Sequence, residues 1–208
     1  MRYFCQMIFF FMWRVRVFGM RNVPPAGGVL LACNHQSFLD PVLVTMALHR
    51  EGNYMARDTL FRHPFFRRLI ESLNAFPVKR STADMGAIKE IIRRLRDGKV
   101  VVTFPEGTRT EDGSIRPLHE GSMLVAKRAG AAVVPTLIAG AFEAWPRTSR
   151  LPRTGVVRVT YGRAIMPAEA EEMSVGELTR RTEASLRELQ RRDSRKSGRE
   201  SVGADLYS

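Results

Sequence analysis

Two short polar segments, each directly after an apolar run, carry residue types that can do chemistry together. Residues 34–40 read NHQSFLD, and residues 104–109 read FPEGTR. A histidine with a nearby carboxylate offers a proton acceptor and the group that orients it. A Glu-Gly-Thr-Arg turn offers a guanidinium beside backbone N–H groups, which suits a phosphate. Together the two segments predict an enzyme that takes a proton from a hydroxyl on a phosphorylated acceptor.

The spacing of His35 and Asp40 depends on where the next helix begins. Inside one helix, five positions would place the two side chains about 140° apart, on different faces. Pro41 is best accommodated near a helix start, so we expect the helix to begin around Ser37 to Asp40 and His35 to precede it. The His35 ring can then fold back toward the Asp40 carboxylate, which would fix its tautomer. The alternative is that Asp40 or Ser37 is simply the helix N-cap.

The second segment supplies donors for an anion. Gly107 permits close approach of the backbone, Thr108 adds a hydroxyl, and Arg109 adds a fork of N–H donors. The alternative is an ordinary surface loop with an internal pair between Glu106 and Arg109. A further cation, Arg80, ends another short apolar run.

Apolar runs and helical patterns alternate along the chain, which predicts an α/β fold. We expect one layered domain with a largely parallel β-sheet flanked by helices, because 208 residues suit a single core. Strands are expected over 29–33, 54–56, 75–78, 99–104, 132–138 and 156–161. Helices are expected after residue 40, around 65–70, over 85–95 and 123–128, and through Leu189. The strands at 29–33 and 99–104 place both polar segments at strand carboxyl ends, where open α/β sheets bind ligands.

The two ends of the chain differ from the predicted domain at 15–190. Residues 7–13 are continuously apolar between Arg2 and Arg14, but they are fewer than the roughly 20 residues of a spanning helix. We expect residues 1–14 to form an interfacial helix in the lipid headgroup region, with Trp13 among its aromatic anchors; a core helix is the alternative. Residues 191–208 are rich in Ser, Arg, Gly and Asp, which predicts a disordered basic tail.

The composition favours polyanionic partners. The net charge is +12, which suits nucleic acid, phospholipid surfaces or phosphorylated ligands. A nucleic-acid-binding module is disfavoured because the sequence has no recognition motif of that kind and the two polar segments would have no role. Cys5 and Cys33 form no disulfide or metal-binding pattern, and Cys33 is expected to be a buried small apolar residue. Without a Gly-x-Ser-x-Gly motif, no covalent intermediate is expected.

With these motifs the chain resembles the glycerolipid acyltransferase family, the 1-acylglycerol-3-phosphate acyltransferases and their relatives. The family's Asn-His-x-x-x-x-Asp motif matches residues 34–40, and its Phe-Pro-Glu-Gly-Thr-Arg motif matches residues 104–109. Its other features match Arg57 before Leu-Phe, Arg80 at the end of the second motif, and the apolar strand with a proline at 133–136. The second motif departs from the family pattern, because residues 75–80 read AFPVKR, and this leaves the acceptor head group open.

The resemblance implies an O-acyltransferase that moves an acyl chain from acyl-CoA or acyl carrier protein to the free hydroxyl of lysophosphatidate, giving phosphatidate. It implies His35 as the general base, Asp40 as its orienting partner, and a phosphate site at Arg80, Glu106, Gly107, Thr108 and Arg109, with Glu106 holding the turn. No cofactor and no metal are implied, and the scattered His49, His63 and His119 fit that expectation.

For location and partners we expect a peripheral or monotopic protein on the cytoplasmic face of an anionic phospholipid membrane, binding a lysophospholipid and no nucleic acid. The alternatives are another acceptor, such as a different lysophospholipid, glycerol 3-phosphate or an aminolipid, and a hydrolase acting on the thioester.

Overall fold

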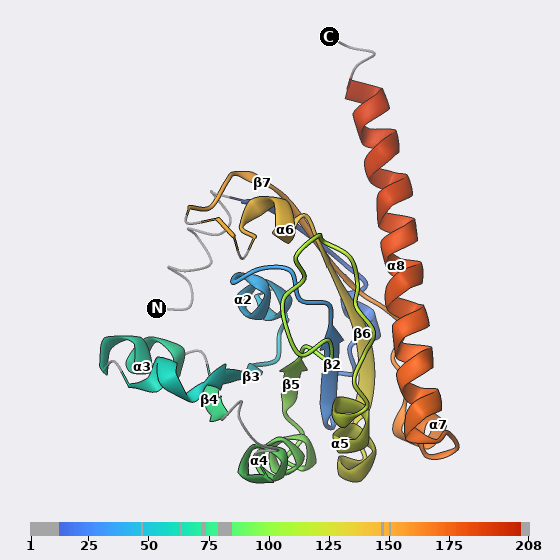
Figure 1. The fold of residues 1–208 in the computed structure, drawn as a ribbon. Helices are drawn as coiled ribbons and strands as arrows, with labels where there is room; N and C mark the ends of the chain where they lie inside the picture. Colours follow the sequence, from blue (N-terminus) through green and yellow to red (C-terminus); the bar gives the residue numbers. More distant parts are fainter. Residues whose placement is uncertain are drawn as a thin grey trace.

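One mixed β-sheet forms the centre of the protein. The computed structural model describes residues 13–46, 48–62, 64–71, 74–78, 85–146, 148–149 and 151–204. Within these residues seven strands are ordered β1-β7-β6-β2-β5-β3-β4 (Figure 1). They are β1 (Trp13–Phe18), β2 (Val29–Cys33), β3 (Gly52–Arg57), β4 (Ala75–Val78), β5 (Val100–Thr103), β6 (Ala132–Ala139) and β7 (Gly155–Tyr161).

The strand directions bring several segments to one edge of the sheet. All neighbouring pairs are parallel except β6 and β7, which are antiparallel. β1 and β7 therefore run against the other five strands, and their amino ends lie at the edge where β2, β5 and β6 have their carboxyl ends. We call this the carboxyl edge of the sheet, and both polar motifs follow strands that end there.

Helices cover both faces of the sheet. They are α2 (Asp40–Thr45), α3 (Pro64–Glu71), α4 (Met85–Arg96), α5 (Gly121–Ala129), α6 (Ala141–Ala144), α7 (Pro167–Glu171) and α8 (Val175–Ala204), with short 3-10 turns η1 (Met20–Asn22) and η2 (Asp58–Phe61). Side chains alternate across a strand, so β2 contributes to two cores. Leu31 packs with Leu43 of α2 on one face, whereas Leu30 packs with Leu95 of α4 and Leu178 of α8 on the other.

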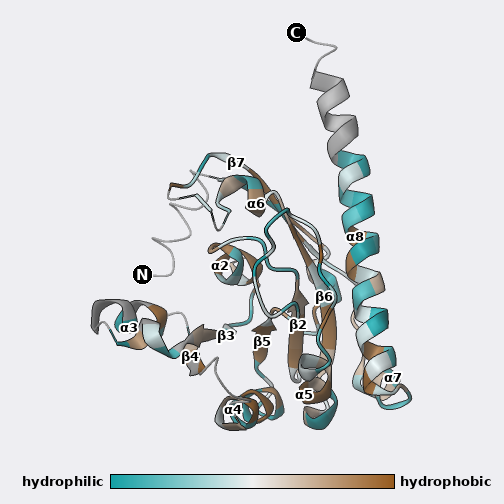
Figure 2. Cartoon of the chain, in the orientation of Figure 1, coloured by the Kyte–Doolittle hydropathy of each residue, from teal (hydrophilic) through white to brown (hydrophobic). Residues whose placement is uncertain are grey.

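The burial of β2 on both faces explains its unbroken apolar sequence. All five residues of β2 are buried, and so are all four of β5 beside it. Figure 2 shows the same pattern, with apolar residues on the central strands and polar residues along α8. The prediction of a single α/β domain with a largely parallel sheet flanked by helices is confirmed.

The amino-terminal prediction requires a correction. Most of the expected interfacial helix falls on residues 1–12, which lie outside the described residues. Trp13 and Arg14, however, begin β1, and Trp13 is only 3% exposed because it packs in the core and donates from Nε1 to the Arg153 carbonyl at 2.7 Å. β1 pairs with β7, which is far away in the sequence. The continuous apolar sequence of residues 7–13 therefore gave no sign that a strand begins at Trp13. Trp13 is therefore a core residue, not a headgroup anchor.

The expected disordered tail also differs from the structure. Helix α8 continues to Ala204, so residues 191–204 are helical, and residues 205–208 lie outside the described part. Glu188 forms ion pairs with Arg191 and Arg192, and Asp193 pairs with Arg158 of β7 at 2.6 Å. These pairs let a charged sequence extend the helix, although it has few apolar residues. Among the described helices, none has both the length and the apolar composition needed to cross a bilayer.

Candidate active site

His35 lies on the turn between β2 and α2. The turn covers residues 34–39, and α2 begins at Asp40 with Pro41 in its first turn. His35 therefore precedes the helix, as the position of Pro41 predicted. His35 and Asp40 are therefore not on one helix, where five positions would have placed their side chains on different faces.

The Asp40 carboxylate organises this turn. Its Oδ2 atom lies 2.8 Å from His35 Nδ1 and accepts from the backbone N–H groups of Gln36 at 2.6 Å and Ser37 at 2.8 Å. An N-cap side chain would accept from residues that follow it, whereas Asp40 accepts from residues that precede it. Asp40 is fully buried, and the His35 side chain is 14% exposed. This geometry orients the ring with Nδ1 toward the carboxylate and leaves Nε2 as the nitrogen that is able to take a proton.

A second contact fixes the face of the imidazole. The ring of Phe104, the residue after β5, stacks on the His35 ring with centroids 4.0 Å apart and an interplanar angle of 20°. Phe104 begins the FPEGTR segment, so the two motifs are in direct contact. The ring of His35 is therefore held by a carboxylate at one edge and an aromatic ring on one face.

Glu106 connects the two motifs through the backbone. Its Oε1 accepts from the N–H of His35 at 2.8 Å, and its Oε2 accepts from the N–H of Arg116 at 3.0 Å. The N–H of Thr110 donates in turn to the His35 carbonyl at 2.8 Å. Glu106 is only 4% exposed, and burial raises the pKa of its carboxyl despite these two hydrogen bonds. Through these hydrogen bonds Glu106 holds the backbone of His35 in place. This contact is compatible with the predicted role of Glu106 in holding the turn.

The rest of the predicted phosphate turn lies beside the first motif. Gly107 has φ +74°, and a Cβ there would come 3.3 Å from the His119 ring, so the position favours glycine. Thr108 and Arg109 are half-buried on the same turn. The guanidinium carbon of Arg109 lies 3.6 Å from the centroid of the Phe38 ring, which belongs to the NHQSFLD segment. The structure therefore brings His35, Asp40, Glu106 and Arg109 to the carboxyl edge together.

One predicted site residue cannot be placed. Arg80 belongs to residues 79–84, which lie outside the described residues. The side chain of Arg57, the family's basic residue before Leu-Phe, is likewise not described. The role expected of Arg80 remains a prediction.

Asn34 has a role that its place in the motif did not reveal. Its side-chain oxygen accepts from the N–H of Ile138 at 2.7 Å, and its side-chain nitrogen donates to the carbonyl of Ile138 at 2.8 Å. A side-chain amide carries the same donor and acceptor as a peptide group. Asn34 therefore continues the pairing of β2 with β6 by one more step and fixes the start of the turn that carries His35. The available signal was an Asn directly after an apolar strand.

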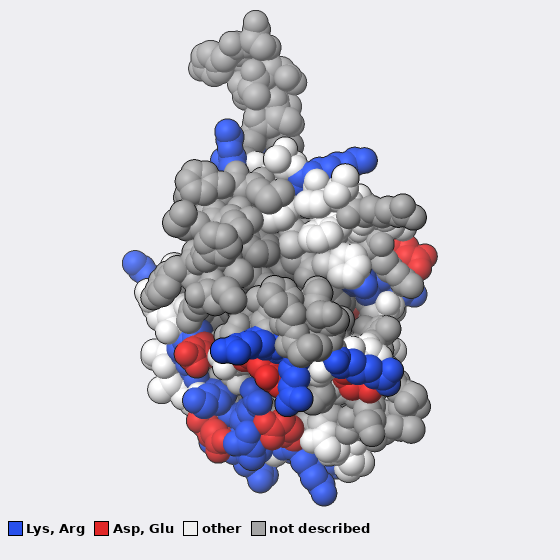
Figure 3. Space-filling model, turned by 90° about the vertical axis from the view of Figure 1, so that its left-hand side faces the viewer, with Lys and Arg blue, Asp and Glu red and all other residues white. Residues whose placement is uncertain are grey.

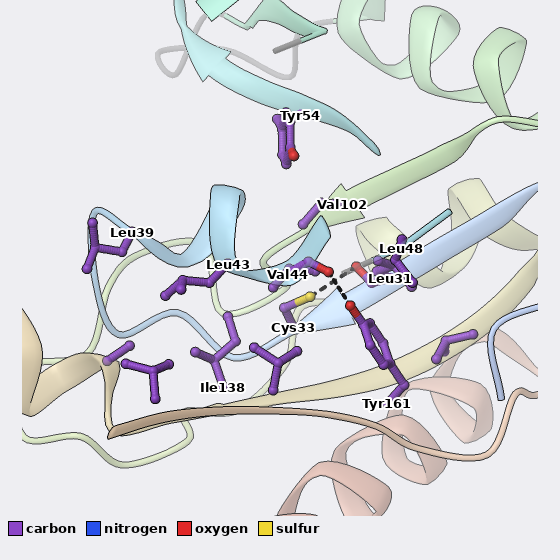
Figure 4. Close-up of a cluster of buried hydrophobic side chains, with 14 of the residues drawn as sticks. Leu31, Cys33, Leu39, Leu43, Val44, Leu48, Tyr54, Val102, Ile138 and Tyr161 are labelled. Atoms are coloured by element: carbon purple, nitrogen blue, oxygen red, sulfur yellow. Dashed lines mark hydrogen bonds between the residues drawn. The ribbon is translucent and has the colours of Figure 1, made fainter. Parts of the chain in front are cut away.

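Two buried tyrosines hold helix α2 in place by hydrogen bonds. The hydroxyl of Tyr161 on β7 donates to the Val44 carbonyl (Figure 4). The hydroxyls of Tyr54 and Thr45 share a second hydrogen bond. Burial raises the pKa of the Tyr161 hydroxyl and of the nearby Cys33 thiol. Cys33 is thus a buried residue of the core, as expected.

A basic hollow of about 510 Å³ lies away from these motifs. It lies at the carboxyl ends of α4 and α5, which lead into the amino ends of β5 and β6, opposite the carboxyl edge. Basic side chains near the carboxyl end of a helix complement the helix dipole. On α4 these basic side chains form ion pairs with acidic ones. The lower part of the face in Figure 3 shows basic and acidic side chains next to one another. The hollow is lined by Lys89, Ile92, Arg93, Arg96, Asp97 and Arg128.

Comparison with known proteins agrees with this arrangement. The model of a family described as Acyltransferase matches residues 14–139, which include both motifs. The chain belongs to this acyltransferase family.

Several relatives of the chain share a name. The 1-acyl-sn-glycerol-3-phosphate acyltransferase of Bacillus subtilis is 32% identical over 127 residues, covering 61% of this chain and 63% of the relative. The enzyme of the same name from Pseudomonas aeruginosa is 29% identical over 180 residues, covering 84% and 68%. The chloroplastic enzyme LPAT1 of Arabidopsis thaliana is 28% identical over 163 residues, covering 76% and 46%. The chain thus spans less than two thirds of the Bacillus relative and under half of the plant relative.

A solved structure has the same fold. The crystal structure of the 1-acyl-sn-glycerophosphate (LPA) acyltransferase PlsC from Thermotoga maritima superposes with a TM-score of 0.79 at 25% identity. The match covers 92% of this chain and 78% of the solved one.

Proposed function

We propose that this acyltransferase moves a fatty acyl chain from acyl-CoA or acyl carrier protein to the free hydroxyl of lysophosphatidate, giving phosphatidate. The observation that carries the proposal is the His35 ring, held by buried Asp40 beside the turn that presents Arg109. The names of the relatives support the same acceptor.

The chemistry needs a base because an alcohol hydroxyl is almost entirely protonated near neutral pH. His35 Nε2 takes the hydroxyl proton as the acceptor oxygen attacks the thioester carbonyl carbon. When the resulting tetrahedral adduct collapses, the C–S bond breaks and the proton returns from His35 to the departing thiolate. Asp40 stabilises the imidazolium between these steps. General base catalysis of this kind contributes typically about 10²–10⁴-fold.

Binding of the acceptor phosphate brings its hydroxyl to His35. The backbone around Gly107, the Thr108 hydroxyl and the Arg109 guanidinium supply donors, and Arg80 assists. Glu106 acts on the base indirectly, since its carboxylate holds the backbone N–H of His35. Once the phosphate is bound, the acceptor hydroxyl is held in an oriented position beside His35 and does not have to reach the base by a free encounter. This orientation is the entropic part of the acceleration.

The membrane is the source of the acceptor in this proposal. We expect a peripheral or monotopic association with the cytoplasmic face, made by residues 1–12 and by basic side chains. Each Lys or Arg near an anionic surface contributes about 1 kcal/mol, and the net charge is +12. A chain lacking residues 1–12 should sediment more weakly with anionic vesicles than the full chain, and equal sedimentation would remove that segment from the membrane contact. The cut stops before Trp13 so that the core stays complete.

The experiment that tests the reaction combines an acceptor panel with single variants. The purified protein is incubated with an acyl thioester and lysophosphatidate, other lysophospholipids, glycerol 3-phosphate or an aminolipid. The expected result is acylated product with lysophosphatidate as the preferred acceptor. Thioester loss without acylated product would instead support a hydrolase, and preference for another acceptor would support the alternative that the AFPVKR segment leaves open.

Variants then assign the roles. His35→Ala should abolish transfer with the melting temperature preserved, whereas His49→Ala, at an exposed histidine away from the motif, should have little effect. Arg109→Ala should chiefly raise the KM for the phosphorylated acceptor. Normal transfer by His35→Ala would refute the role of His35 as the base. An unchanged acceptor KM for Arg109→Ala would mean that the phosphate binds elsewhere.

A further inference from the structure

An aromatic ring in the catalytic turn supports the arginine of the phosphate turn. Phe38 lies between His35 and Asp40 in sequence, and its ring centroid is 3.6 Å from the Arg109 guanidinium carbon. At this distance the guanidinium is in van der Waals contact with the ring face. Phe38 is nevertheless 52% exposed, so burial in the core does not account for its position.

The ring is itself held in place. Its neighbour Ser37 donates from Oγ to the Trp145 carbonyl at 2.8 Å, and the Trp145 ring packs against Phe38 with centroids 5.6 Å apart and tilted by 49°. Trp145 Nε1 donates to the Ser149 carbonyl at 3.1 Å, which fixes the tryptophan in turn. The Phe38 ring is therefore a fixed surface between Arg109 and the loop after α6.

Stacking suits an arginine that must bind an oxyanion. A guanidinium on an aromatic face is attracted by the ring, and its N–H donors still point outward in its own plane. The Phe38 backbone belongs to the turn that Asp40 fixes through the N–H groups of Gln36 and Ser37. The position of the arginine is thus coupled to the position of the His35 ring.

We propose that Phe38 is a positioning residue that holds Arg109 at a set distance from His35, so that the guanidinium meets the acceptor phosphate while the hydroxyl meets the base. This inference rests on the proposed function, because it concerns the phosphate site of that reaction. It predicts that an aromatic face is required at position 38. An apolar contact with an acyl chain or a lipid would instead be served equally well by leucine.

The test compares Phe38→Leu, Phe38→Tyr and the wild-type protein. For Phe38→Leu we expect the acceptor KM to rise about 2–10-fold, which corresponds to the loss of one partly exposed cation–π contact. The donor KM should stay unchanged, and Phe38→Tyr should remain within about twofold of wild type because it keeps the ring. Phe18→Leu is the matched control, since Phe18 is also exposed and has a cation, Lys196, 5.5 Å from its ring, but lies away from the motifs.

A second arm measures phosphate binding without turnover. Inorganic phosphate should raise the melting temperature of the wild-type protein and of Phe38→Tyr, and Phe38→Leu should need about 2–10-fold more phosphate for the same shift. In an Arg109→Ala background, Phe38→Leu should have no further effect, because the group that it positions is gone. This arm gives an answer even if lysophosphatidate is not the acceptor, so it separates failure of this inference from failure of the proposed function.

The inference is overturned by any of three results. They are equal acceptor KM and phosphate response in Phe38→Leu and wild type, equal damage by Phe38→Leu and Phe38→Tyr, and a full effect of Phe38→Leu in the absence of Arg109.

Discussion

Replacing Asp40 by asparagine removes a charge from the turn that carries His35 and nearly preserves the shape of that turn. The Oδ2 atom accepts from Gln36 and Ser37 N–H groups at 2.6 and 2.8 Å, and an amide oxygen in the same place can still accept both. The other oxygen, Oδ1, is buried without a hydrogen-bond partner in the described part of the chain, so an NH2 group there displaces no bond. The variant should therefore keep the turn and lose the negative charge that, in the proposed reaction, stabilises the His35 imidazolium.

The size of the effect follows from the geometry. With the ring and carboxylate centres about 4 Å apart and an effective dielectric constant of about 20, the attraction is roughly 4 kcal/mol. Water screens this attraction little, because Asp40 is 0% exposed and the His35 side chain 14%. At about 1.36 kcal/mol for each tenfold change, kcat should fall roughly 10³-fold.

The assay is steady-state acyl transfer at saturating acyl thioester and lysophosphatidate, with the melting temperature measured in parallel. Asp97→Asn is the matched control, because Asp97 pairs with Arg93 on the surface of the opposite edge and is 49% exposed. Its kcat should stay within about twofold of wild type, as expected for a surface ion pair. A kcat for Asp40→Asn within about tenfold of wild type, with the fold intact, would refute the role assigned to the charge.

Two further substitutions test the supports of the site. Glu106→Gln should lower the free energy of unfolding by about 1–3 kcal/mol, because an amide can accept from only one of the two backbone N–H groups. Burial raises the pKa of Glu106 in the folded protein, so its contribution is complete below the unfolded pKa and is lost as pH rises through the folded pKa. In urea unfolding from pH 4 upward, the stability gap between wild type and Glu106→Gln should narrow; a widening gap would contradict the assigned direction. Tyr161→Phe should cost about 1–3 kcal/mol in the same assay, because the Val44 carbonyl loses its buried donor. A cost near zero would mean that this carbonyl is satisfied in another way.

The local parts of the site were predictable from sequence. Pro41 marked the start of α2 and so placed His35 before it, and five consecutive apolar residues marked β2 as a strand buried on both faces. These features depend on short-range sterics and on periodicity, which the sequence carries directly.

The contacts between distant segments were not predictable in the same way. Glu106 meets the backbone of His35 across 71 positions, and Arg109 meets Phe38 from a separate loop. Both depend on how two loops are oriented above the sheet, which no short-range pattern encodes. Trp13 was misassigned for the same reason, since its pairing with Gly155 joins segments far apart in the sequence. The helix beyond residue 191 was missed because composition suggested disorder, whereas the Asp193–Arg158 ion pair anchors it to β7.

The reversed direction of β1 has a practical consequence for anyone who labels this protein. Trp13 starts at the edge of the sheet that carries His35, and its indole nitrogen bonds to Arg153 in the loop before β7. Twelve extended residues reach at most about 40 Å. A fluorophore attached just ahead of Trp13 will therefore stay within energy-transfer range of a second label placed at the carboxyl edge.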